Sequence, residues 1–500
     1  MQTTFSNMPV HPNSKAGVFF VNNQLALPPL LKAISNGIVE KVIENRGDFK
    51  GKIKQIIAIN LPFPAGVEIV ILVGTGENYK DGGSTCDALR NIGADMVNRL
   101  NAMKISHADV YVEDIGTGGC STACIALGAK LRNYIFNKYY TVNFEEHVLT
   151  LNSLNFYSSD YQAAMQEFKR LEVVADSTLM ARDLVSEPSN VIYPDSFAKI
   201  CQELSDFGLK VEVLMPDEMK KLGMGALLGV AQGSANSPRL VILEWYGAKD
   251  DKEAQTLAFV GKGVTFDSGG INIKTHPSIS DMKDDMGGAA VVVGLMKALA
   301  RRHAKVNAIG ILALVENMPS GTAQRPGDVV KSMSEQTIEI DNTDAEGRLI
   351  LVDAMWYVQT RYQPAILVDV ATLTGAVVVA LGDIYAGLFS NNNELAEQLL
   401  KAGETTGELV WRFPLNEQYD KQMDSDIADV KNAGQANRGG GAITAAQFLQ
   451  RFIKDKKHCR WAHIDIAGVC WIKTGTNLAP KGATGFGVRL LEQFVHDNYE

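Results

Sequence analysis

Several segments in the second half of the chain are apolar along almost their whole length. Examples are "TLAFVGKGVTF", "VNAIGILALVEN" and "AILVDVATL". A strand with one face in water alternates polar and apolar residues, whereas continuous apolarity is typical of a strand that is covered on both faces. Helical patterns such as "GGAAVVVGLMKALARRH" separate these strands. The alternation predicts an α/β fold in which helices flank a central mixed sheet.

The first part of the chain alternates in the same way. "AGVFFVNN" and "VEIVILVGTG" predict strands, and "STCDALRNIGADMVNRLNAM" predicts a helix. Five hundred residues exceed the size of one typical core, so we expect two domains or more. The pattern becomes helical over 161–185 and is followed by the proline-containing stretch "SEPSNVIYPDSF". We therefore expect an α/β domain at 1–158, a linker helix at 159–188 and a larger domain at 189–500.

Composition limits the possible partners and compartments. The formal net charge of −9 argues against general nucleic-acid binding. The apolar runs are shorter than a membrane span, and the N-terminus lacks the pattern of a secretory signal. The six cysteines form no C-x-x-C pair, which is typical of free thiols in a reducing compartment. We expect a soluble cytoplasmic protein with no membrane or nucleic-acid partner.

Three segments of the second half carry residues that could perform chemistry. The first, "VGKGVTFDSGGINIK", contains Lys262, Asp267 and Lys274. We expect a strand through Lys262, a glycine-rich turn at Asp267 and a second strand that ends at Lys274. The alternative is a lysine beside a turn whose side chain extends to solvent. A phosphate-binding loop is a weak interpretation, since the spacing that such a loop requires is absent.

The second segment, "DMKDDMGGAAVVVGLMKAL", places Asp281, Asp284 and Asp285 before a helix that begins with small residues. Acidic residues also stabilise a helix N-terminus through the helix dipole. Both interpretations are equally open for this segment alone.

The third segment, "NTDAEGRL", places Asp344, Glu346 and Arg348 at alternate positions, with Ala345 and Gly347 between them. In an extended chain, residues two apart face the same way, so the three charged groups would converge on one point. A surface salt bridge or a helix cap is the alternative, although a cap needs only one carboxylate.

Together the segments supply four carboxylates that would repel one another strongly in a partly desolvated pocket. They are Asp267, Asp285, Asp344 and Glu346. Either protonation or cations could relieve the repulsion, and two divalent ions would balance the four charges. Such oxygen ligands suit Mn²⁺, Mg²⁺ or Zn²⁺. Two ions about 3.5–4 Å apart can activate water and polarise a carbonyl group.

Three cationic side chains accompany the carboxylates. Lysine loses its proton readily when it is buried near positive charge, so a neutral Lys262 could be a nitrogen ligand. Lys274 and Arg348 would remain charged and could stabilise a developing oxyanion.

The segments "NTDAEGRL", "VGKGVTFDSGG" and "DMGGAA" resemble the signature segments of the leucyl aminopeptidase family, also called cytosol aminopeptidases. The resemblance extends through most of the second half and includes "RDLVSEPSNVIYP", "RGGGAITAAQFL" and "WAHIDIAGV". In the first domain it is only architectural. It implies a catalytic peptidase domain at 189–500, preceded by a macro-like α/β domain.

The resemblance also assigns roles by position. It implies two divalent ions per subunit, Mn²⁺ or Zn²⁺, with the ligands Lys262, Asp267, Asp285, Asp344 and Glu346. It implies that Lys274 and Arg348 are catalytic and that a bicarbonate can act as the base at Arg348. The implied substrate pocket contains Met282, Thr372, Ala467 and Cys470. Many relatives have methionine where Cys470 stands, and the smaller side chain changes the pocket volume.

The implied activity is the removal of N-terminal residues, leucine and others, from peptides in intracellular turnover. Water activated by two metal ions would attack the peptide bond without a covalent intermediate, and the chain would assemble as a homohexamer. A DNA-binding protein, an inactive relative and another dinuclear hydrolase, such as a phosphatase, are the alternatives. A salt-dependent gel shift would detect DNA binding, and a phosphate-ester assay would detect a phosphatase.

Overall fold

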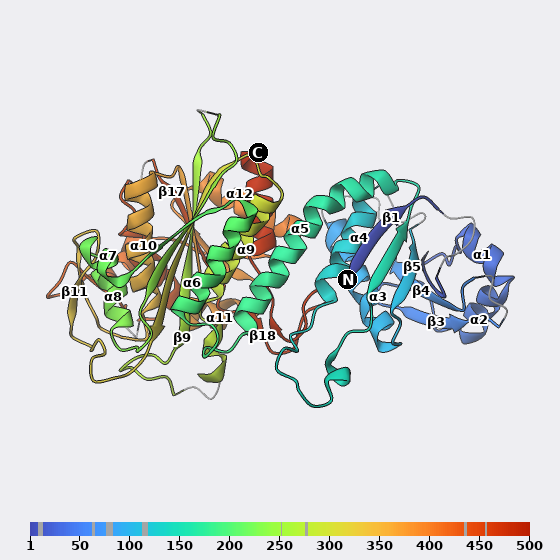
Figure 1. The fold of residues 1–500 in the computed structure, drawn as a ribbon, viewed down its shortest axis with the longest axis horizontal. Helices are drawn as coiled ribbons and strands as arrows, with labels where there is room; N and C mark the ends of the chain where they lie inside the picture. Colours follow the sequence, from blue (N-terminus) through green and yellow to red (C-terminus); the bar gives the residue numbers. More distant parts are fainter. Residues whose placement is uncertain are drawn as a thin grey trace. The chain divides into compact units, whose positions relative to one another are not determined.

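The computed structural model divides the chain into two compact units (Figure 1). The first contains residues 1–175 and 474–480, and the second contains residues 176–473 and 481–500. The division lies inside the long helix α5 (Tyr161–Ser186). The structure describes residues 1–8, 14–62, 66–76, 84–112, 119–251, 253–275, 279–434, 438–455 and 458–500. Within these ranges, no helix combines the length and the hydrophobicity that crossing a membrane requires.

The first unit contains a mixed sheet with the strand order β1-β6-β5-β2-β4-β3. Neighbouring strands are parallel except β3 and β4, which are antiparallel. The strands are β1 (Gln2–Ser6), β2 (Ala16–Asn22), β3 (Ile56–Asn60), β4 (Ile69–Gly76), β5 (His107–Tyr111) and β6 (Ser153–Tyr157).

Strand β2 shows why its sequence is apolar throughout. Val18 and Phe20 pack into the core that contains α3 (Ser84–Ala102) and α4 (Gly119–Arg132). Phe19 and Val21 pack into the core on the other face. Successive residues of a strand point to opposite faces, so a strand between two cores needs an apolar residue at every position. The second core contains residues of α1 (Pro29–Ser35) and α2 (Ile38–Arg46).

The second unit is built on a larger mixed sheet with the order β15-β14-β17-β13-β9-β10-β8-β7. Its centre, β17-β13-β9-β10, is parallel. Strand β8 is antiparallel to β10 and to β7, and β14 is antiparallel to β17. The strands are β7 (Lys210–Leu214), β8 (Arg239–Tyr246), β9 (Thr256–Asp267), β10 (Asn307–Asn317), β13 (Ile366–Ala371), β14 (Ala386–Ser390), β15 (Val410–Arg412) and β17 (Arg460–Asp465).

Helices cover both faces of this sheet. Leu257 and Phe259 of β9 pack into one core, and Ala258 and Val260 pack into the other. The first core contains residues of α6 (Pro194–Gln202), α9 (Gly287–Arg301), α12 (Asn393–Thr406) and α15 (Val488–Tyr499). The second contains residues of α8 (Gly225–Ala231), α10 (Gly347–Tyr362) and α14 (Gly441–Gln450).

Shorter elements complete the second unit. Strands β11, β12 and β16 form one small sheet, and β18 and β19 form another. The remaining α-helices and strands of the second unit are α7 (Pro216–Lys221), α11 (Gly375–Leu381), α13 (Glu417–Asp420), β11 (Val329–Lys331), β12 (Thr337–Glu339), β16 (Val430–Lys431), β18 (Trp471–Ile472) and β19 (Gly482–Ala483).

The predicted α/β architecture, with a smaller mixed sheet followed by a larger one, is confirmed. The predicted second strand that ends at Lys274 is wrong. Strand β9 continues to Asp267, and residues 268–275 form turns and irregular structure. Gly269 and Gly270 have φ angles of +87° and +65°, which only glycine adopts readily. The two glycines turn the chain sharply, so no strand follows.

Candidate active site

A cavity of about 880 Å³ lies where the central parallel strands end. Asp267 is the last residue of β9, Thr372 follows β13, and Ala467 lies two residues after β17. All three residues line the cavity. In open α/β sheets, ligands bind at the carboxyl ends of the strands. The position of the cavity therefore favours a binding or catalytic site.

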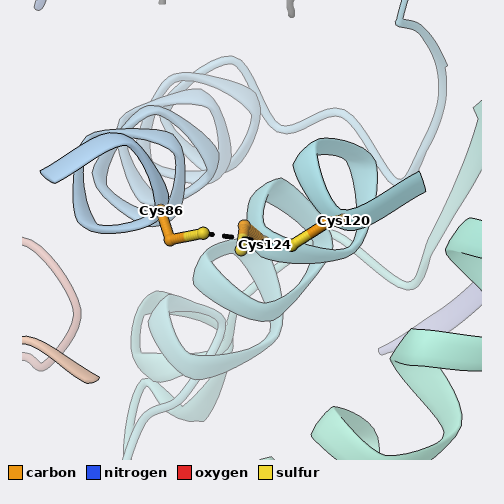
Figure 2. A group of neighbouring side chains, drawn as sticks. All are labelled: Cys86, Cys120 and Cys124. Carbon is orange, nitrogen blue, oxygen red and sulfur yellow. Dashed lines mark hydrogen bonds between the residues drawn. The ribbon is translucent and has the colours of Figure 1, made fainter. Parts of the chain in front are cut away.

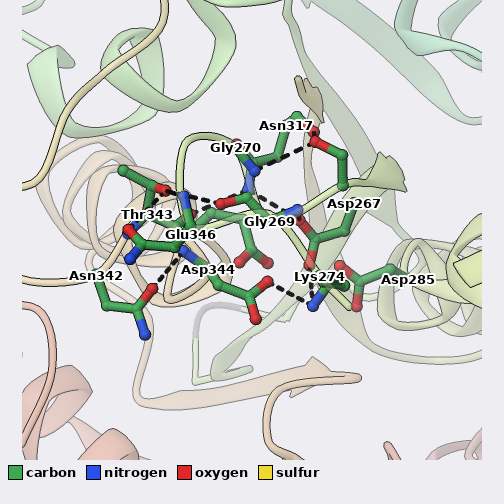
Figure 3. Close-up of polar contacts among 12 residues, drawn as sticks. Asp267, Gly269, Gly270, Lys274, Asp285, Asn317, Asn342, Thr343, Asp344 and Glu346 are labelled. Carbon is green, nitrogen blue, oxygen red and sulfur yellow. Dashed lines mark hydrogen bonds and ion pairs between the residues drawn. The ribbon is translucent and has the colours of Figure 1, made fainter. Parts of the chain in front are cut away.

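Three carboxylates meet in this cavity (Figure 3). Oxygens of Asp267, Asp344 and Glu346 lie within 4.8 Å of one another. Asp267 and Glu346 are buried, and Asp344 is partly exposed. Asp344 and Glu346 lie in the segment that leads into α10, whereas Asp267 ends β9. The structure thus brings together groups from segments that are far apart in the sequence.

The segment "NTDAEGRL" is not extended, so the condition under which its charged groups would converge by alternation is not met. The backbone NH of Ala345 donates to the Asn342 carbonyl at 3.2 Å, which closes a turn. The Asn342 side chain also accepts from the Asp344 NH at 2.8 Å. Glu346 has helical backbone angles, and α10 begins at the next residue. Asp344 and Glu346 are brought together by a turn and a helix start rather than by the alternation of a strand.

Polar residues that the sequence analysis missed hold this loop against the end of β9. Asn317, at the end of β10, donates to Asp267 Oδ1 at 2.8 Å and to the Thr343 carbonyl at 3.0 Å. Thr343 Oγ1 donates to the Gly269 carbonyl at 2.7 Å and accepts from the Asn272 NH at 2.8 Å. An amide at the end of a buried apolar strand is the signal that could have identified Asn317.

Lys262 is buried and lies beside two of the carboxylates. Its Nζ is 2.6 Å from Asp285 Oδ1 and 2.9 Å from Glu346 Oε1, and it donates to the Thr372 carbonyl at 2.7 Å. Burial opposes the charge of Lys262, but the carboxylates, Asp285 first, outweigh burial and raise its pKa above the usual range. A Cβ atom on Gly347 would lie 2.6 Å from Lys262 Cε, so this glycine makes room for the lysine.

Lys274 connects two of the carboxylates at the cavity wall. Its Nζ lies 2.7 Å from Asp267 Oδ2 and 2.5 Å from Asp344 Oδ1. Burial favours the neutral amine, yet the negative charges, Asp267 first, raise the pKa of Lys274 above its usual range. Its side chain is 18% exposed, so its ammonium group can reach a ligand in the cavity.

Asp285, two residues before α9, completes the acidic group. Thr372 Oγ1 donates to Asp285 Oδ1 at 2.8 Å. Among the residues that the structure describes, Asp285 Oδ2 is buried without a hydrogen-bond donor. Burial raises the pKa of this carboxyl well above its usual range. A buried oxygen without a donor and a cluster of carboxylates that outnumber the lysines fit the ligand set of a divalent cation.

Arg348 is buried and lies on α10, one residue after Gly347. Its Nη1 donates to the Asn432 carbonyl at 2.6 Å. Burial lowers the pKa of Arg348 to about 10, so the guanidinium stays charged at neutral pH. Its buried Nε has no acceptor within the described part of the chain. Arg348 is not among the described residues that line the cavity.

The structure places three of the four predicted pocket residues on the cavity wall. Met282, Thr372 and Ala467 line the cavity. Cys470 is buried and lies outside the described lining. A Cβ atom on Gly287 would lie 2.3 Å from Cys470 Sγ, so this cysteine packs directly against the first residue of α9. The cavity wall also contains apolar side chains, namely Ile273, Leu373, Val378, Val379 and Trp471.

Comparisons with known proteins agree along nearly the whole chain. Residues 179–492 match the family described as "Cytosol aminopeptidase family, catalytic domain", and residues 18–143 match its N-terminal domain. The probable cytosol aminopeptidase of Brucella melitensis biotype 1 is 51% identical over 439 residues, which cover 87% of this chain and 88% of that protein.

Two solved structures are similar in fold as well as in sequence. A mutant of tomato leucine aminopeptidase superposes with a TM-score of 0.87 at 32% identity and covers 100% of this chain and 97% of its own. The bottromycin maturation enzyme BotP in complex with Mn has a TM-score of 0.84 at 31% identity and covers 97% of this chain and 100% of its own.

The manganese in that relative is consistent with the buried carboxylates of this chain, because oxygen ligands suit Mn²⁺. The N-terminal and catalytic domains of the family match in the expected order, and the match to the catalytic domain covers more than half of the 500 residues. We conclude that the chain belongs to the cytosol (leucyl) aminopeptidase family and is a metal-dependent aminopeptidase.

Proposed function

We propose that this aminopeptidase removes leucine and other N-terminal residues from peptides during peptide turnover in the cytoplasm. The observation that carries the proposal is the acidic cluster around Lys262, at the carboxyl ends of β9 and β13, which opens into a cavity with an apolar wall. Water would attack the peptide bond directly, so that no covalent intermediate forms.

The proposed ligands of two divalent ions, Mn²⁺ or Zn²⁺, are Lys262, Asp267, Asp285, Asp344 and Glu346. Bound there, the ions would supply a ligand for the free α-amine of the peptide, polarisation of the scissile carbonyl and a lower pKa for water. Lys262 contacts Asp285 and Glu346 as an ammonium group. It would have to lose its proton to offer nitrogen as a ligand.

Lys274 is the proposed electrophile. Its ammonium group lies at the cavity wall between Asp267 and Asp344. From this position it can donate a hydrogen bond to the scissile carbonyl oxygen and stabilise the negative charge that develops there.

Arg348 is proposed to hold a bicarbonate that acts as the base. The buried Nε, which lacks an acceptor within the described residues, is a donor that an anion could use. Because Arg348 keeps its charge at neutral pH, an anion beside it would be stabilised.

The proposed side-chain pocket contains Met282, Thr372 and Ala467 on the cavity wall, with Cys470 behind it. Of the described residues that line the cavity, none is histidine. Ser–His and Cys–His nucleophiles depend on such a base. This supports direct attack by water.

Loss and return of metal is the test of this proposal. Dialysis against a chelator should abolish hydrolysis of leucine p-nitroanilide, and Mn²⁺ or Zn²⁺ should restore it. The same preparation should not hydrolyse p-nitrophenyl phosphate. A chelated protein that keeps full peptidase activity, or one that acts on the phosphate ester, would contradict the proposal.

A matched pair of variants locates the metal. Asp344→Asn should lower the metal content and reduce activity by more than about 100-fold, since it removes a charged ligand. Asp341→Asn makes the same chemical change three residues earlier, at an exposed position outside the cavity lining. It should retain metal and activity. Equal behaviour of the two variants would remove Asp344 from the ligand set.

A further inference from the structure

Three cysteines of the first unit form a second cluster of potential metal ligands (Figure 2). Their Sγ atoms all lie within 4.8 Å of one another, and those of Cys86 and Cys120 are 4.0 Å apart. Cys86 is on α3, and Cys120 and Cys124 are on α4. The spacing of four places Cys120 and Cys124 on one face of their helix, and Figure 2 shows this face turned toward Cys86. All three thiols are free.

The sulfur positions are close to those of a metal–thiolate site. Zinc–sulfur bonds are about 2.3 Å long, which places the sulfurs of a tetrahedral site about 3.8 Å apart. The observed separations need only small side-chain adjustments to reach this value. Thiolates also select Zn²⁺ and Cu⁺ over the harder ions that prefer carboxylates.

Close packing of α3 against α4 holds the cysteines in place. A Cβ atom on Gly93 would lie 2.1 Å from the Ile125 carbonyl oxygen, and one on Gly128 would lie 1.9 Å from the Arg90 carbonyl oxygen. Both glycines therefore permit backbone contact between the two helices. Two helices fixed in this way present their sulfurs without a large ordering cost on binding.

The exposure of the cluster also favours a metal. Metals bind cysteine in its thiolate form. Cys120 is exposed and Cys124 is buried, so an ion can enter from the Cys120 side and bind water there as a further ligand.

We propose that Cys86, Cys120 and Cys124 bind one thiophilic metal ion, Zn²⁺ or Cu⁺, through three thiolates. The site is separate from the carboxylate cluster and does not depend on the proposed peptidase mechanism. Binding releases the thiol protons to solvent, as metal coordination by cysteine requires.

Cobalt titration of the reduced full-length protein tests the proposal. Co²⁺ bound to cysteine shows a thiolate-to-metal charge-transfer band, whereas the proposed peptidase ligands contain only oxygen and nitrogen. When the proposed peptidase site has first been filled with Mn²⁺, we expect a band that reaches its maximum at one further Co²⁺ per chain. Excess Zn²⁺ should displace it if Zn²⁺ is bound, and Cu⁺ supplied with a competing chelator should displace it if Cu⁺ is preferred.

Cysteine variants provide the controls. Cys86→Ser and Cys120→Ser should each weaken Co²⁺ binding at least tenfold, and Cys201→Ser, at a buried cysteine of the second unit, should leave the band unchanged. Each variant should keep its aminopeptidase activity. Cys120 is exposed, so this substitution is compatible with folding. The proposal fails if the band is absent, if it survives in both cluster variants, or if Cys201→Ser removes it.

Discussion

At the scale of single residues, Lys274 can be separated experimentally from the proposed metal ligands. Its ammonium group lies beside Asp267 and Asp344 but reaches the cavity. Lys274→Ala should lower kcat by about 10²–10³-fold, the usual cost of losing a donor to a developing oxyanion. Metal content should not change. Steady-state kinetics with metal analysis checks both expectations, with the exposed Lys401→Ala as the control. Unchanged kcat would contradict the role of Lys274.

The gathering of the carboxylates was predictable because charged residues beside small residues and buried strands are conspicuous in a sequence. Their supporting residues were not predictable in the same way. Asn317 and Thr343 carry common amide and hydroxyl groups, and only the folded structure shows that they connect two distant loops. The hydrogen bond from Arg348 to the Asn432 carbonyl was also hidden, because it joins residues that are far apart in the sequence.

Asp353 provides a prediction about pH. It is buried on α10 and accepts from the backbone NH groups of Leu227 and Met333 at 2.9 and 2.7 Å. Burial raises its pKa from 3.8 to about 7. In the unfolded chain this carboxyl ionises near its ordinary pKa, while in the folded protein it keeps its proton. Its contribution to stability is therefore fully present in acid, falls as the pH rises from about 4 to about 7, and then stays constant.

The comparison of the native protein with Asp353→Asn isolates this effect, because the variant cannot ionise. The difference in unfolding free energy, native minus variant, should decrease by up to about 1.4 kcal/mol per pH unit between about pH 5 and pH 7. Denaturant titrations at a series of pH values measure it. A difference that stays constant or increases over this range would show that the folded-state pKa of Asp353 is not raised.

At the scale of secondary-structure elements, continuous apolarity correctly predicted the buried strands. The segments predicted from "TLAFVGKGVTF" and "VNAIGILALVEN" became β9 and β10 within a few residues. The wrong elements were those whose conformation depends on distant partners. "INIK" resembles a strand, yet Asn272 in this stretch accepts from the Thr343 NH at 2.8 Å, so a contact with another loop decides its conformation.

The contact between α9 and the sheet depends on a glycine. A Cβ atom on Gly288 would lie 2.0 Å from the Val370 carbonyl oxygen of β13, and both elements are buried. Gly288→Ala should therefore destabilise the protein by about 1–3 kcal/mol, the usual cost of overpacking, and should displace Asp285, which lies three residues earlier. The temperature of thermal unfolding and the affinity for metal should both decrease. Gly321→Ala, at a glycine with no atom within 4 Å of the added Cβ, is the control. Equal stability of the two variants would contradict the close contact.

At the scale of the whole molecule, the sequence predicted two α/β units but not the path of the chain between them. Residues 474–480 belong to the first unit although they are near the C-terminus. Leu478 is buried in the core of that unit. One leucine in a short polar stretch gives no periodic signal, so only the folded chain reveals its place. The expected boundaries at 158 and 188 stay a prediction.

Assembly as a homohexamer is proposed from the family resemblance. It requires apolar side chains that are exposed on the isolated subunit and buried between subunits. Ile384, two residues before β14, is 64% exposed, and Trp411 on β15 is 58% exposed. Strand β14 pairs with β15, so these side chains lie on neighbouring segments. Exposed apolar residues that gather in this way mark interaction surfaces.

If the chain forms the proposed homohexamer, light scattering coupled to size-exclusion chromatography should give the mass of six 54.3 kDa chains. Trp411→Glu should shift the protein toward smaller species, because a carboxylate buried in an interface loses its hydration without gaining a partner. Val142→Glu changes an exposed apolar residue of the first unit, 74% exposed, and should leave the mass unchanged. A native protein that elutes as a monomer would refute the homohexamer, and a hexameric Trp411→Glu variant would place the interface elsewhere on the subunit.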